Sequence, residues 1–220
     1  MQTKQTIAII GAAGKMGSAI ARSLSFGNYR LLLYSTDLAK SAAVVENIKI
    51  TNPASEVEAI LCNYNACWEA DIIIMAVPYH AEKGIVEKIK DVANQKIVIS
   101  ITNPLNETFD GLLTAPNTSA AEELQFLLPH SKVIKAFNTT FAANFETPVI
   151  DGKITDSFIA GDDAQALETV AQLVSTAGFN PIIAGELAVS RTLEAMQLLL
   201  IRLGLKYKYD WLAGWKILHH

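Results

Sequence analysis

The sequence carries little charge and shows no excess of basic side chains. Of its 220 residues, 18 are Lys or Arg and 22 are Asp or Glu, which gives a formal net charge of −4. Binding to a nucleic-acid backbone requires clustered Lys and Arg side chains, and the sequence has no such cluster. We therefore expect no nucleic-acid partner.

The sequence also lacks a long hydrophobic run. Half of the residues are hydrophobic, which is enough for a sizeable core. The longest apolar runs, such as residues 72–77, are nevertheless far shorter than the roughly 20 residues that span a bilayer. Residues 1–6 are polar and do not resemble a signal peptide. We expect a soluble chain with no membrane partner.

Cysteine is scarce, since Cys62 and Cys67 are the only two. They do not form a Cys-x-x-Cys pair, and no second group of Cys or His completes a metal site. We therefore expect no bound metal. Two thiols of this kind are typical of a reducing compartment, which predicts a cytoplasmic location.

A glycine-rich turn stands near the N-terminus, where residues 7–17 read IAIIGAAGKMG. An apolar run leads into Gly11, Gly14 and Gly17, and the segment that follows has a helical pattern of apolar residues. In such a turn the first glycine lets the chain leave the strand sharply, the second makes room for a pyrophosphate, and the third lets the helix pack closely. The phosphates lie on N–H groups at the positive end of the helix. This order predicts a dinucleotide site; the alternative is an ordinary turn between a strand and a helix.

Strands alternate with helices over the first two-thirds of the chain. We predict strands at residues 7–10, 30–34, 71–77, 96–101 and 132–137, and helices at residues 37–45, 79–92 and 119–128. One more strand is expected at residues 60–62, with residues 48–51 as the competing position. The alternation predicts parallel strands with right-handed crossovers, which is the α/β fold of a Rossmann-type, doubly wound sheet.

The last third of the chain continues the alternation. Strands are expected at residues 157–160 and 179–184, and helices at residues 163–177 and 186–205. No linker rich in Gly, Ser or Pro separates this part from the rest. We predict a dinucleotide-binding domain over residues 1–150 and a small C-terminal α/β extension, residues 151–220, that docks on the same sheet.

The expected carboxyl ends of the strands, where ligands of such sheets bind, carry hydroxyl and amide side chains. They lack a Ser-His-Asp set, a pair of carboxylates and a nucleophilic Cys. This chemistry suits hydride transfer, in which the cofactor reacts and the protein positions it, so we predict no catalytic side chain. His80, Asn103 and Asn138 are candidates to contact the cofactor or the acceptor. The alternatives are an exposed helix residue for His80 and turn-closing roles for both Asn residues.

The end of the second strand selects the nucleotide, because an acid there binds the ribose 2′-hydroxyl and a basic residue accepts a 2′-phosphate. Ser35 and Thr36 are not acidic and can donate to a phosphate, and Lys40 follows one helical turn later. Asp37 is either a ribose ligand or a helix N-cap. We favour NADP over NAD.

Aromatic residues crowd the C-terminus at Tyr207, Tyr209, Trp211 and Trp215. Such a cluster belongs to a core or an interface, or it forms the wall of a site for an aromatic ligand.

Five segments together resemble a known family. They read GAAGKMG, ADIIIMAVPYHA, KIVISITNPL, SAAEELQFLLPHSKVIKAFNT and IAGELAVSRTLEAM. Their order is similar to that in NADPH-dependent reductases of the deazaflavin coenzyme F-420, and to the cytoplasmic oxidoreductase domain of the six-transmembrane ferric reductases. The resemblance implies a homodimer with a C-terminal extension that forms the acceptor cleft and the dimer surface. It also implies hydride transfer between NADP(H) and a flavin-like acceptor, with F-420 first and FMN or FAD second.

The resemblance also implies which residues bind the cofactor. The pyrophosphate would lie against Gly11, Ala13, Gly14, Lys15 and Met16, and the 2′-phosphate would face Ser35 and Thr36. Residues near the nicotinamide or the path toward it would be Val77, Pro78, His80, Asn103 and Asn138. The family carries Arg at the position of Thr36, and small residues at the positions of Phe141 and Phe145.

Two alternative functions remain open. A reductase of a small carbonyl or imine substrate would need a proton donor, for which Tyr79 and His80 are the candidates. A non-catalytic NADP-binding protein would bind the nucleotide without turnover.

Overall fold

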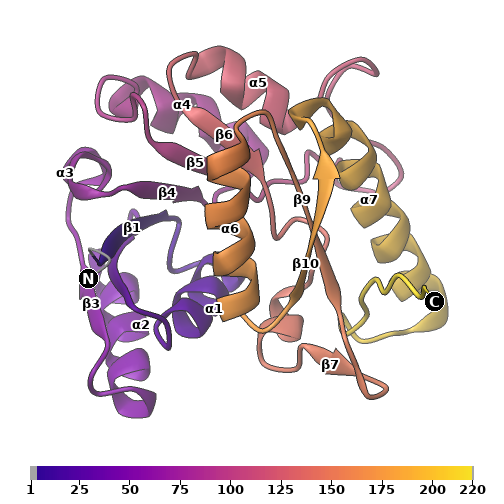
Figure 1. Ribbon diagram of the computed structural model, residues 1–220, viewed down its shortest axis with the longest axis horizontal. Coiled ribbons are helices and arrows are strands. Elements are labelled where there is room, and N and C mark those ends of the chain that lie inside the picture. Colours follow the sequence, from indigo (N-terminus) through magenta and orange to yellow (C-terminus); the bar gives the residue numbers. More distant parts are fainter. Residues whose placement is uncertain (1–3, 220) are drawn as a thin grey trace.

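The computed structural model describes residues 4–219 and consists of one large sheet, a short hairpin and helices on both faces of the sheet (Figure 1). The large sheet contains β1 (Gln5–Ile10), β2 (Tyr29–Tyr34), β3 (Glu56–Ala59), β4 (Ile72–Met75), β5 (Ile97–Ser100), β6 (Lys132–Lys135), β9 (Asp156–Gly161) and β10 (Asn180–Gly185). The hairpin consists of β7 (Val149–Ile150) and β8 (Lys153–Ile154). The α-helices are α1 (Lys15–Leu24), α2 (Leu38–Thr51), α3 (Asn63–Glu69), α4 (Tyr79–Ile89), α5 (Ala120–Leu127), α6 (Ala164–Thr176) and α7 (Ser190–Tyr207), and two 3₁₀ turns are η1 (Ala142–Phe145) and η2 (Leu187–Val189).

The sheet is doubly wound. Its strand order is β10-β9-β6-β5-β4-β1-β2-β3, and the six strands from β3 to β6 are parallel. The strand order reverses between β1 and β4, which is where such sheets bind their ligands. The α/β fold with a mostly parallel sheet is therefore confirmed.

Both faces of the sheet are buried, as the continuous apolar strands require. Ile7 and Ile9 of β1 pack on one face in a cluster with residues of α1, α2 and α6. Ala8 and Ile10 pack on the opposite face in a cluster with residues of α3, α4 and α5. Side chains along a strand point alternately to its two sides, so one short strand contributes to two cores.

The prediction of the third strand was wrong in both of its forms. α2 continues to Thr51, so residues 48–51 are helical, and residues 60–62 form the loop between β3 and α3. The actual strand, β3, lies at the sheet edge and alternates exposed Glu56 and Glu58 with buried Val57. An edge strand of four residues with one buried side chain lacks the apolar run by which the central strands are recognised.

The last third of the chain extends the sheet. β9 pairs antiparallel with β6, and β10 pairs parallel with β9. α7, a helix of 18 residues, lies beside this end of the sheet, and the C-terminus is on the opposite side of the molecule from the N-terminus (Figure 1). No helix within residues 4–219 is both long and apolar enough to cross a membrane.

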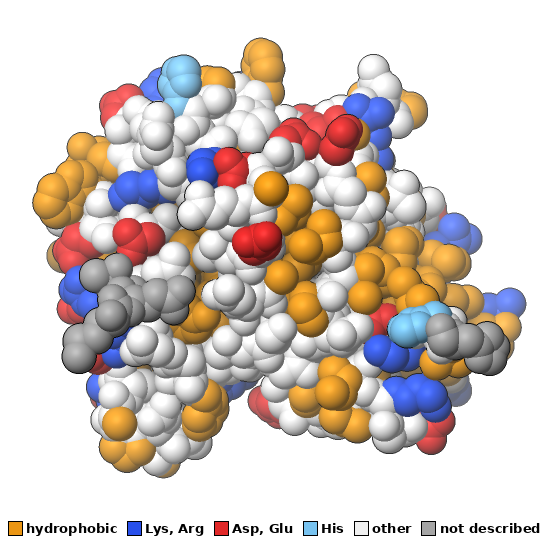
Figure 2. Space-filling view, viewed as in Figure 1, with side chains coloured by type: hydrophobic (Ala, Val, Ile, Leu, Met, Phe, Trp, Pro, Cys, Tyr) orange, Lys and Arg blue, Asp and Glu red, His pale blue; other side chains and the backbone are white. Residues whose placement is uncertain are grey.

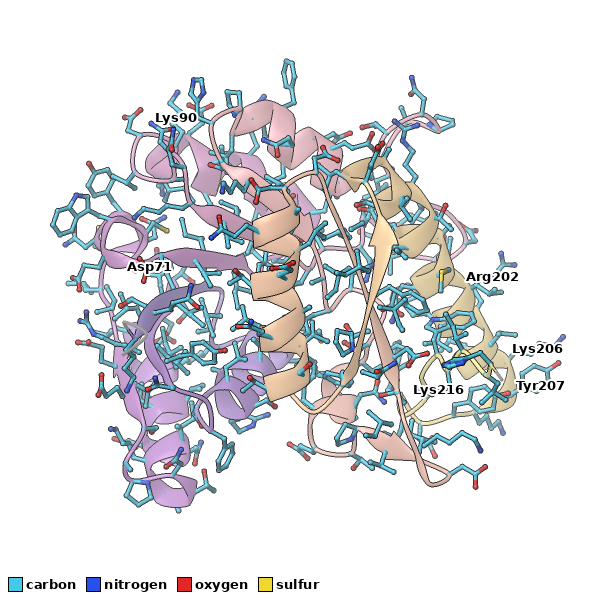
Figure 3. All side chains as sticks on the ribbon, in the orientation of Figure 1. Asp71, Lys90, Arg202, Lys206, Tyr207 and Lys216 are labelled. Atoms are coloured by element: carbon cyan, nitrogen blue, oxygen red, sulfur yellow. The ribbon has the colours of Figure 1, made fainter. Side chains whose placement is uncertain are left out.

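The C-terminal segment returns from α7 to the start of β9 and is held there by Asp156. The Asp156 carboxylate accepts hydrogen bonds from Lys216 Nζ at 2.7 Å and from the Ile217 N–H at 2.6 Å. Although burial acts in the opposite direction, the Ile217 N–H and the Lys216 ammonium hold the pKa of Asp156 below its usual value. Figure 3 shows Lys216 on this returning segment, while Arg202 and Lys206 point away from the sheet.

Candidate functional site

The glycine turn after β1 is fixed against neighbouring strands. Gly11 has a φ of +92°, which residues with a side chain rarely adopt. A Cβ atom on Gly11 would lie 2.2 Å from the carbonyl oxygen of Ala76, so no other residue fits there. The N–H groups of Gly11 and Ala12 both donate to the carbonyl oxygen of Tyr34, at 2.8 and 2.9 Å. The turn therefore lies at the carboxyl ends of β2 and β4.

The start of α1 leaves space for an anion. A Cβ atom on Gly14 would meet only the Gly11 carbonyl oxygen, at 3.3 Å, whereas one on Gly17 would lie 2.4 Å from that oxygen. No side chain caps α1, and its first turn has no acidic residue. The first N–H groups of a helix have no acceptor within it. Those of Lys15 and Met16 are therefore available to a phosphate.

The end of β2 presents one exposed hydroxyl, that of Thr36. The Ser35 hydroxyl lies 2.7 Å from both the Asp37 carbonyl oxygen and Ser41 Oγ, so it bonds within the loop and α2. Asp37 is the N-cap of α2 and accepts hydrogen bonds from the N–H of Lys40, at 3.3 Å, and of the residue before it, at 3.1 Å. The structure thus shows Asp37 in the capping role that the sequence left open.

The loop after β4 carries Val77 and Pro78, which lead into α4. Val77 lies beside the glycine turn, because a Cβ atom on Gly11 would be 2.9 Å from its side chain. Tyr79 donates its hydroxyl proton to Glu123 Oε2 at 2.5 Å, and burial together with this bond raises the Tyr79 pKa. His80 is exposed on the first turn of α4. Neither side chain lines the cavity described below, so neither is placed to give a proton to a ligand bound there.

Asn103 and Asn138 join the ends of β5 and β6. The Asn103 amide donates to the Asn138 carbonyl oxygen at 2.8 Å, and the Asn138 amide donates to Asn103 Oδ1 at 3.0 Å. Asn138 Oδ1 is buried and has no hydrogen-bond partner among the described residues. Six other buried side-chain atoms among the described residues also lack a partner, so this oxygen alone does not identify a ligand.

A cavity of about 450 Å³ joins these parts. It extends from Lys15 and Met16 at the start of α1, past Asn103 and Asn138, to Gln197 and Ile201 on α7. The remaining lining residues are Ile101, Phe137, Thr140, Phe141, Ala142, Ala143 and Trp211. Its size is that of a pocket for a small organic ligand, and the lining is mostly apolar with a few polar groups.

Trp211 closes one side of this cavity. Its ring packs edge-on against Phe141, with 5.5 Å between the ring centroids and an angle of 85°, and against Phe109 at 6.5 Å. Lys208, Asp210 and Trp211 all have positive φ angles, between 49° and 59°, so the chain turns sharply after α7. Trp211 remains 50% exposed, so it forms the outer wall.

The other aromatic residues near the C-terminus lie elsewhere. Tyr207 and Tyr209 stack on each other at 5.8 Å and are exposed, and Trp215 packs between the side chains of α7 and the sheet. Phe145 does not reach the cavity, because it packs in the core against Phe137 and Phe179. Of the two phenylalanines singled out from the sequence, Phe141 alone lines the cavity.

Sequence reasoning missed a buried polar group beneath the strand ends. Lys135 and Glu194 form an ion pair at 2.6 Å, and both side chains are 0% exposed. Glu82 is also buried and accepts a hydrogen bond from the Thr102 hydroxyl. Burial, partly opposed by the Thr102 hydroxyl and by Lys135, raises the pKa of Glu82 to about 7. The available signal was a lysine within the apolar run of residues 132–137.

Comparison with known proteins gives a consistent family. The family model described as NADP oxidoreductase, coenzyme F420-dependent, matches residues 6–104. An F420-dependent NADP reductase from Methanocaldococcus jannaschii is 31% identical over 92% of this chain and 93% of its own length. The metalloreductase STEAP3 of Rattus norvegicus is 33% identical over 48% of this chain, which corresponds to 21% of that protein.

Solved structures show the same fold. A protein from Arthrobacter sp. FB24, provisionally assigned as an F420-dependent NADP reductase, superposes with a TM-score of 0.78 at 23% identity and covers 93% of this chain and 95% of its own. An imine reductase from Myxococcus stipitatus gives a TM-score of 0.69 at 15% identity over 94% of this chain and 64% of its own. At these identities the likeness establishes the fold alone. Together with the full-length match to the Methanocaldococcus relative, these findings show that the chain belongs to the family of F420-dependent NADP reductases.

Proposed function

We propose that this chain transfers hydride between the nicotinamide of NADP(H) and the deazaflavin coenzyme F420. The observation that carries the proposal is the cavity between the start of α1 and α7, in which Lys15 is the one ionisable lining residue. Such a cavity can hold ligands in position, and apart from Lys15 its lining offers no general acid or base. Direct hydride transfer between two rings requires neither. FMN and FAD are the second choice of acceptor.

The glycine turn fits a pyrophosphate. A Cβ on Gly14 would meet one atom, the Gly11 carbonyl oxygen at 3.3 Å, and no acidic side chain lies in the first turn of α1. We assign the pyrophosphate site to Gly11, Ala13, Gly14, Lys15 and Met16, where the available N–H groups of Lys15 and Met16 and the Lys15 ammonium favour an anion.

The end of β2 supports NADP as the nucleotide. Thr36 and Lys40 are exposed there, and Asp37 is occupied as the N-cap of α2. Asp37 Oδ1 accepts the two capping hydrogen bonds and Oδ2 lies 3.7 Å from Lys40 Nζ, so both oxygens of the carboxylate have partners at the start of α2. We assign the 2′-phosphate to the exposed hydroxyl of Thr36, with Ser35 holding the loop through its bonds to Asp37 and Ser41.

The nicotinamide end is assigned to the loops after β4, β5 and β6. When bound, the dinucleotide supplies or accepts the hydride. Asn103 and Asn138 both line the cavity, and we assign the carboxamide to their amide groups, which two hydrogen bonds hold together. Val77, Pro78 and the exposed His80 follow β4 but do not line the cavity, so we assign them to the path that leads toward the nicotinamide. The acceptor ring would lie against the apolar wall formed by Phe141, Ile201 and Trp211.

The competing functions lack a comparable observation. Reduction of a small carbonyl or imine needs a proton donor, yet the Tyr79 hydroxyl is bonded to Glu123 and His80 does not line the cavity. Binding of NADP without turnover would not account for the apolar part of the cavity formed by Phe141, Ile201 and Trp211. Both remain as outcomes of the test.

The test is turnover with a panel of acceptors. The purified chain is mixed without oxygen with NADPH and, in turn, F420, FMN, FAD and a cyclic imine, and NADPH oxidation is followed by its absorbance. We expect rapid oxidation with F420, and slower or no oxidation with the others. Tight NADPH binding without turnover would indicate a binding protein, and turnover with the imine alone would replace the proposed acceptor.

We also propose that the chain works as a homodimer in the cytoplasm. Exposed apolar side chains gather on the α7 side of the molecule, including Leu205, Tyr207, Leu212 and Leu218, as Figure 2 illustrates. Exposed apolar surfaces of this kind mark interaction sites, and we propose that residues 151–220 form the dimer surface. The free thiols of Cys62 and Cys67 suit a reducing compartment. Sedimentation equilibrium of the purified chain tests the dimer, and a monomer at all concentrations would refute it.

A further inference from the structure

We propose that the buried ion pair of Lys135 and Glu194 sets the distance between the two walls of the cavity, which makes both of them positioning residues for hydride transfer. The inference rests on the function proposed above. It concerns residues that do not line the cavity themselves but connect the elements that do.

Lys135 is tied to the wall formed by the strand ends. Its ammonium donates to the carbonyl oxygen of Thr102, the residue directly before Asn103. Lys135 also ends β6, two residues before Phe137 and three before Asn138, both of which line the cavity. One cation therefore fixes the loops after β5 and β6, which together carry both asparagines of the site.

The chain between Lys135 and Asn138 is under local strain. Phe137 is fully buried and has a φ of +59°, a left-handed conformation that is unfavourable for a residue with a large side chain. Strained residues persist where their surroundings hold them, and they gather at ligand sites. The Lys135 ammonium on one side of Phe137 and the Asn103–Asn138 hydrogen bonds on the other supply that hold.

Glu194 is tied to the opposite wall. It lies on the buried face of α7 with Gln197 and Ile201, three and seven residues further on, and both of these line the cavity. Its second oxygen accepts from the N–H of Ala120 at the start of α5, at 3.2 Å. The ion pair thus connects α7 and α5 to the strand ends at a single point, at 2.6 Å.

Stability alone does not account for this pair. Burying two charges requires removing both from water, and apolar residues of similar size stabilise a core about as well or better. The ion pair, however, makes directional hydrogen bonds to both walls of the cavity, so it fixes the distance between them. An apolar contact has no such directionality and would not fix that distance.

The test replaces both charges at once, because a single replacement would leave a buried charge unpaired. In Lys135→Met with Glu194→Gln, the glutamine keeps an acceptor for the Ala120 N–H. The matched control is Lys132→Met with Asp163→Asn, which removes the surface ion pair at 3.0 Å on the same strand and retains an N-cap for α6. For each protein the unfolding midpoint, the NADPH affinity and the single-turnover rate of hydride transfer to F420 are measured.

We expect the buried double variant to keep its fold and its NADPH affinity while hydride transfer slows by about 100-fold, since a displacement near 1 Å suffices for such a loss. The surface double variant should match the wild type in all three measurements. A buried double variant that folds and transfers hydride at the wild-type rate would overturn the proposal.

A second variant guards against a failure to fold. Glu194→Asp keeps both charges but shortens the side chain by one methylene, so it shifts α7 without leaving a charge unpaired. Its transfer rate should fall by about 10-fold with the fold retained, and an unchanged rate would contradict the proposal. If both variants unfold, the pair is a stability element and the proposal is wrong. The wild-type rate is measured first, because its absence refutes the proposed function and this inference together.

Discussion

Gly14 and Gly17 stand one helical turn apart, yet a side chain at each would have a different effect. Gly14→Val should retain the fold, because its Cβ meets a single atom at 3.3 Å and needs a shift of only a few tenths of an ångström. It should weaken NADPH binding by about 100-fold, because the side chain blocks the phosphate from the N–H donors at the start of α1. Gly17→Val should lower the free energy of unfolding by about 1–3 kcal/mol, because its Cβ would overlap the Gly11 carbonyl oxygen at 2.4 Å. Calorimetric titration and urea unfolding separate the two. Unchanged NADPH affinity in Gly14→Val would remove the assignment of the pyrophosphate site.

Thr36 is the position where a single residue should strengthen the nucleotide preference. Thr36→Arg places a guanidinium beside the assigned 2′-phosphate, and a charge-assisted bond there should raise NADPH affinity by about 10-fold. The affinity for NADH, which lacks the phosphate, should not change. Thr36→Gln, similar in reach but uncharged, is the control. Equal gains for both nucleotides would show that Thr36 does not face the phosphate.

Glu82 should make the stability of the protein depend on pH. Its pKa rises from 4.5 to about 7 in the folded protein, mainly through burial, so the folded chain binds a proton that the unfolded chain has released. Stability should therefore fall as the pH rises between these values and level off above about pH 7, a change of up to about 3 kcal/mol. The groups that face it are the Thr102 hydroxyl, Lys135, Glu194 and Glu123.

Glu82→Gln removes this titration. Relative to the wild type, the variant should gain stability as the pH rises from about 5 to about 8. Urea unfolding at several pH values measures the difference. Glu87→Gln on the same helix is the control, since Glu87 is exposed and pairs with Lys90 at 3.0 Å. Parallel profiles for wild type and Glu82→Gln would show that Glu82 is ionised throughout.

The turn after α7 is the element that should govern the acceptor. Trp211→Ala removes the outer wall of the cavity and its packing on Phe141 and Phe109. The acceptor KM should rise by about 10-fold, which corresponds to the loss of one aromatic contact, while NADPH affinity stays unchanged. Trp68→Ala on α3, 66% exposed and outside the cavity lining, is the control. A loss of NADPH affinity in Trp211→Ala would place the dinucleotide, and not the acceptor, at this wall.

Among the elements, those with buried, continuous apolar runs could be predicted from the sequence, and so could the glycine turn. β4, β5 and β6 stand out because both of their faces are covered. β3 could not be predicted, since it has one buried residue and its place is set by pairing with β2. α3 has seven residues, too few for a periodic pattern, and was also missed.

The site could be predicted only in part, for a related reason. Gly11, Asn103 and Asn138 lie within three residues of the ends of β1, β5 and β6, so their meeting at one edge follows from the parallel topology. Trp211 and Phe141 are in contact because the chain reverses after α7, and Lys135 pairs with Glu194, which lies 59 residues later in the sequence. No local pattern encodes such contacts, which depend on how distant elements pack.

At the scale of the whole molecule, the two predicted parts share one core. The cluster on one face of the sheet contains Ile9 and Ile20 from the N-terminal part and Ile159, Val170 and Phe179 from the C-terminal part. The full chain should therefore unfold in one cooperative transition, and residues 1–150 alone should not fold, because truncation exposes this cluster and the edge of β6. Circular dichroism of both during heating is the measurement. A cooperative transition in the fragment would establish residues 1–150 as an independent domain.

The ion pair of Lys135 and Glu194 also bears on how the chain is made. Synthesis delivers β6 well before α7, so the lysine leaves the ribosome 59 residues ahead of its partner. Until the last helix arrives, closing the strands over that lysine would bury an unpaired ammonium, at a cost of several kcal/mol. We therefore expect the strand ends around Lys135 to pack only after α7 has been synthesised.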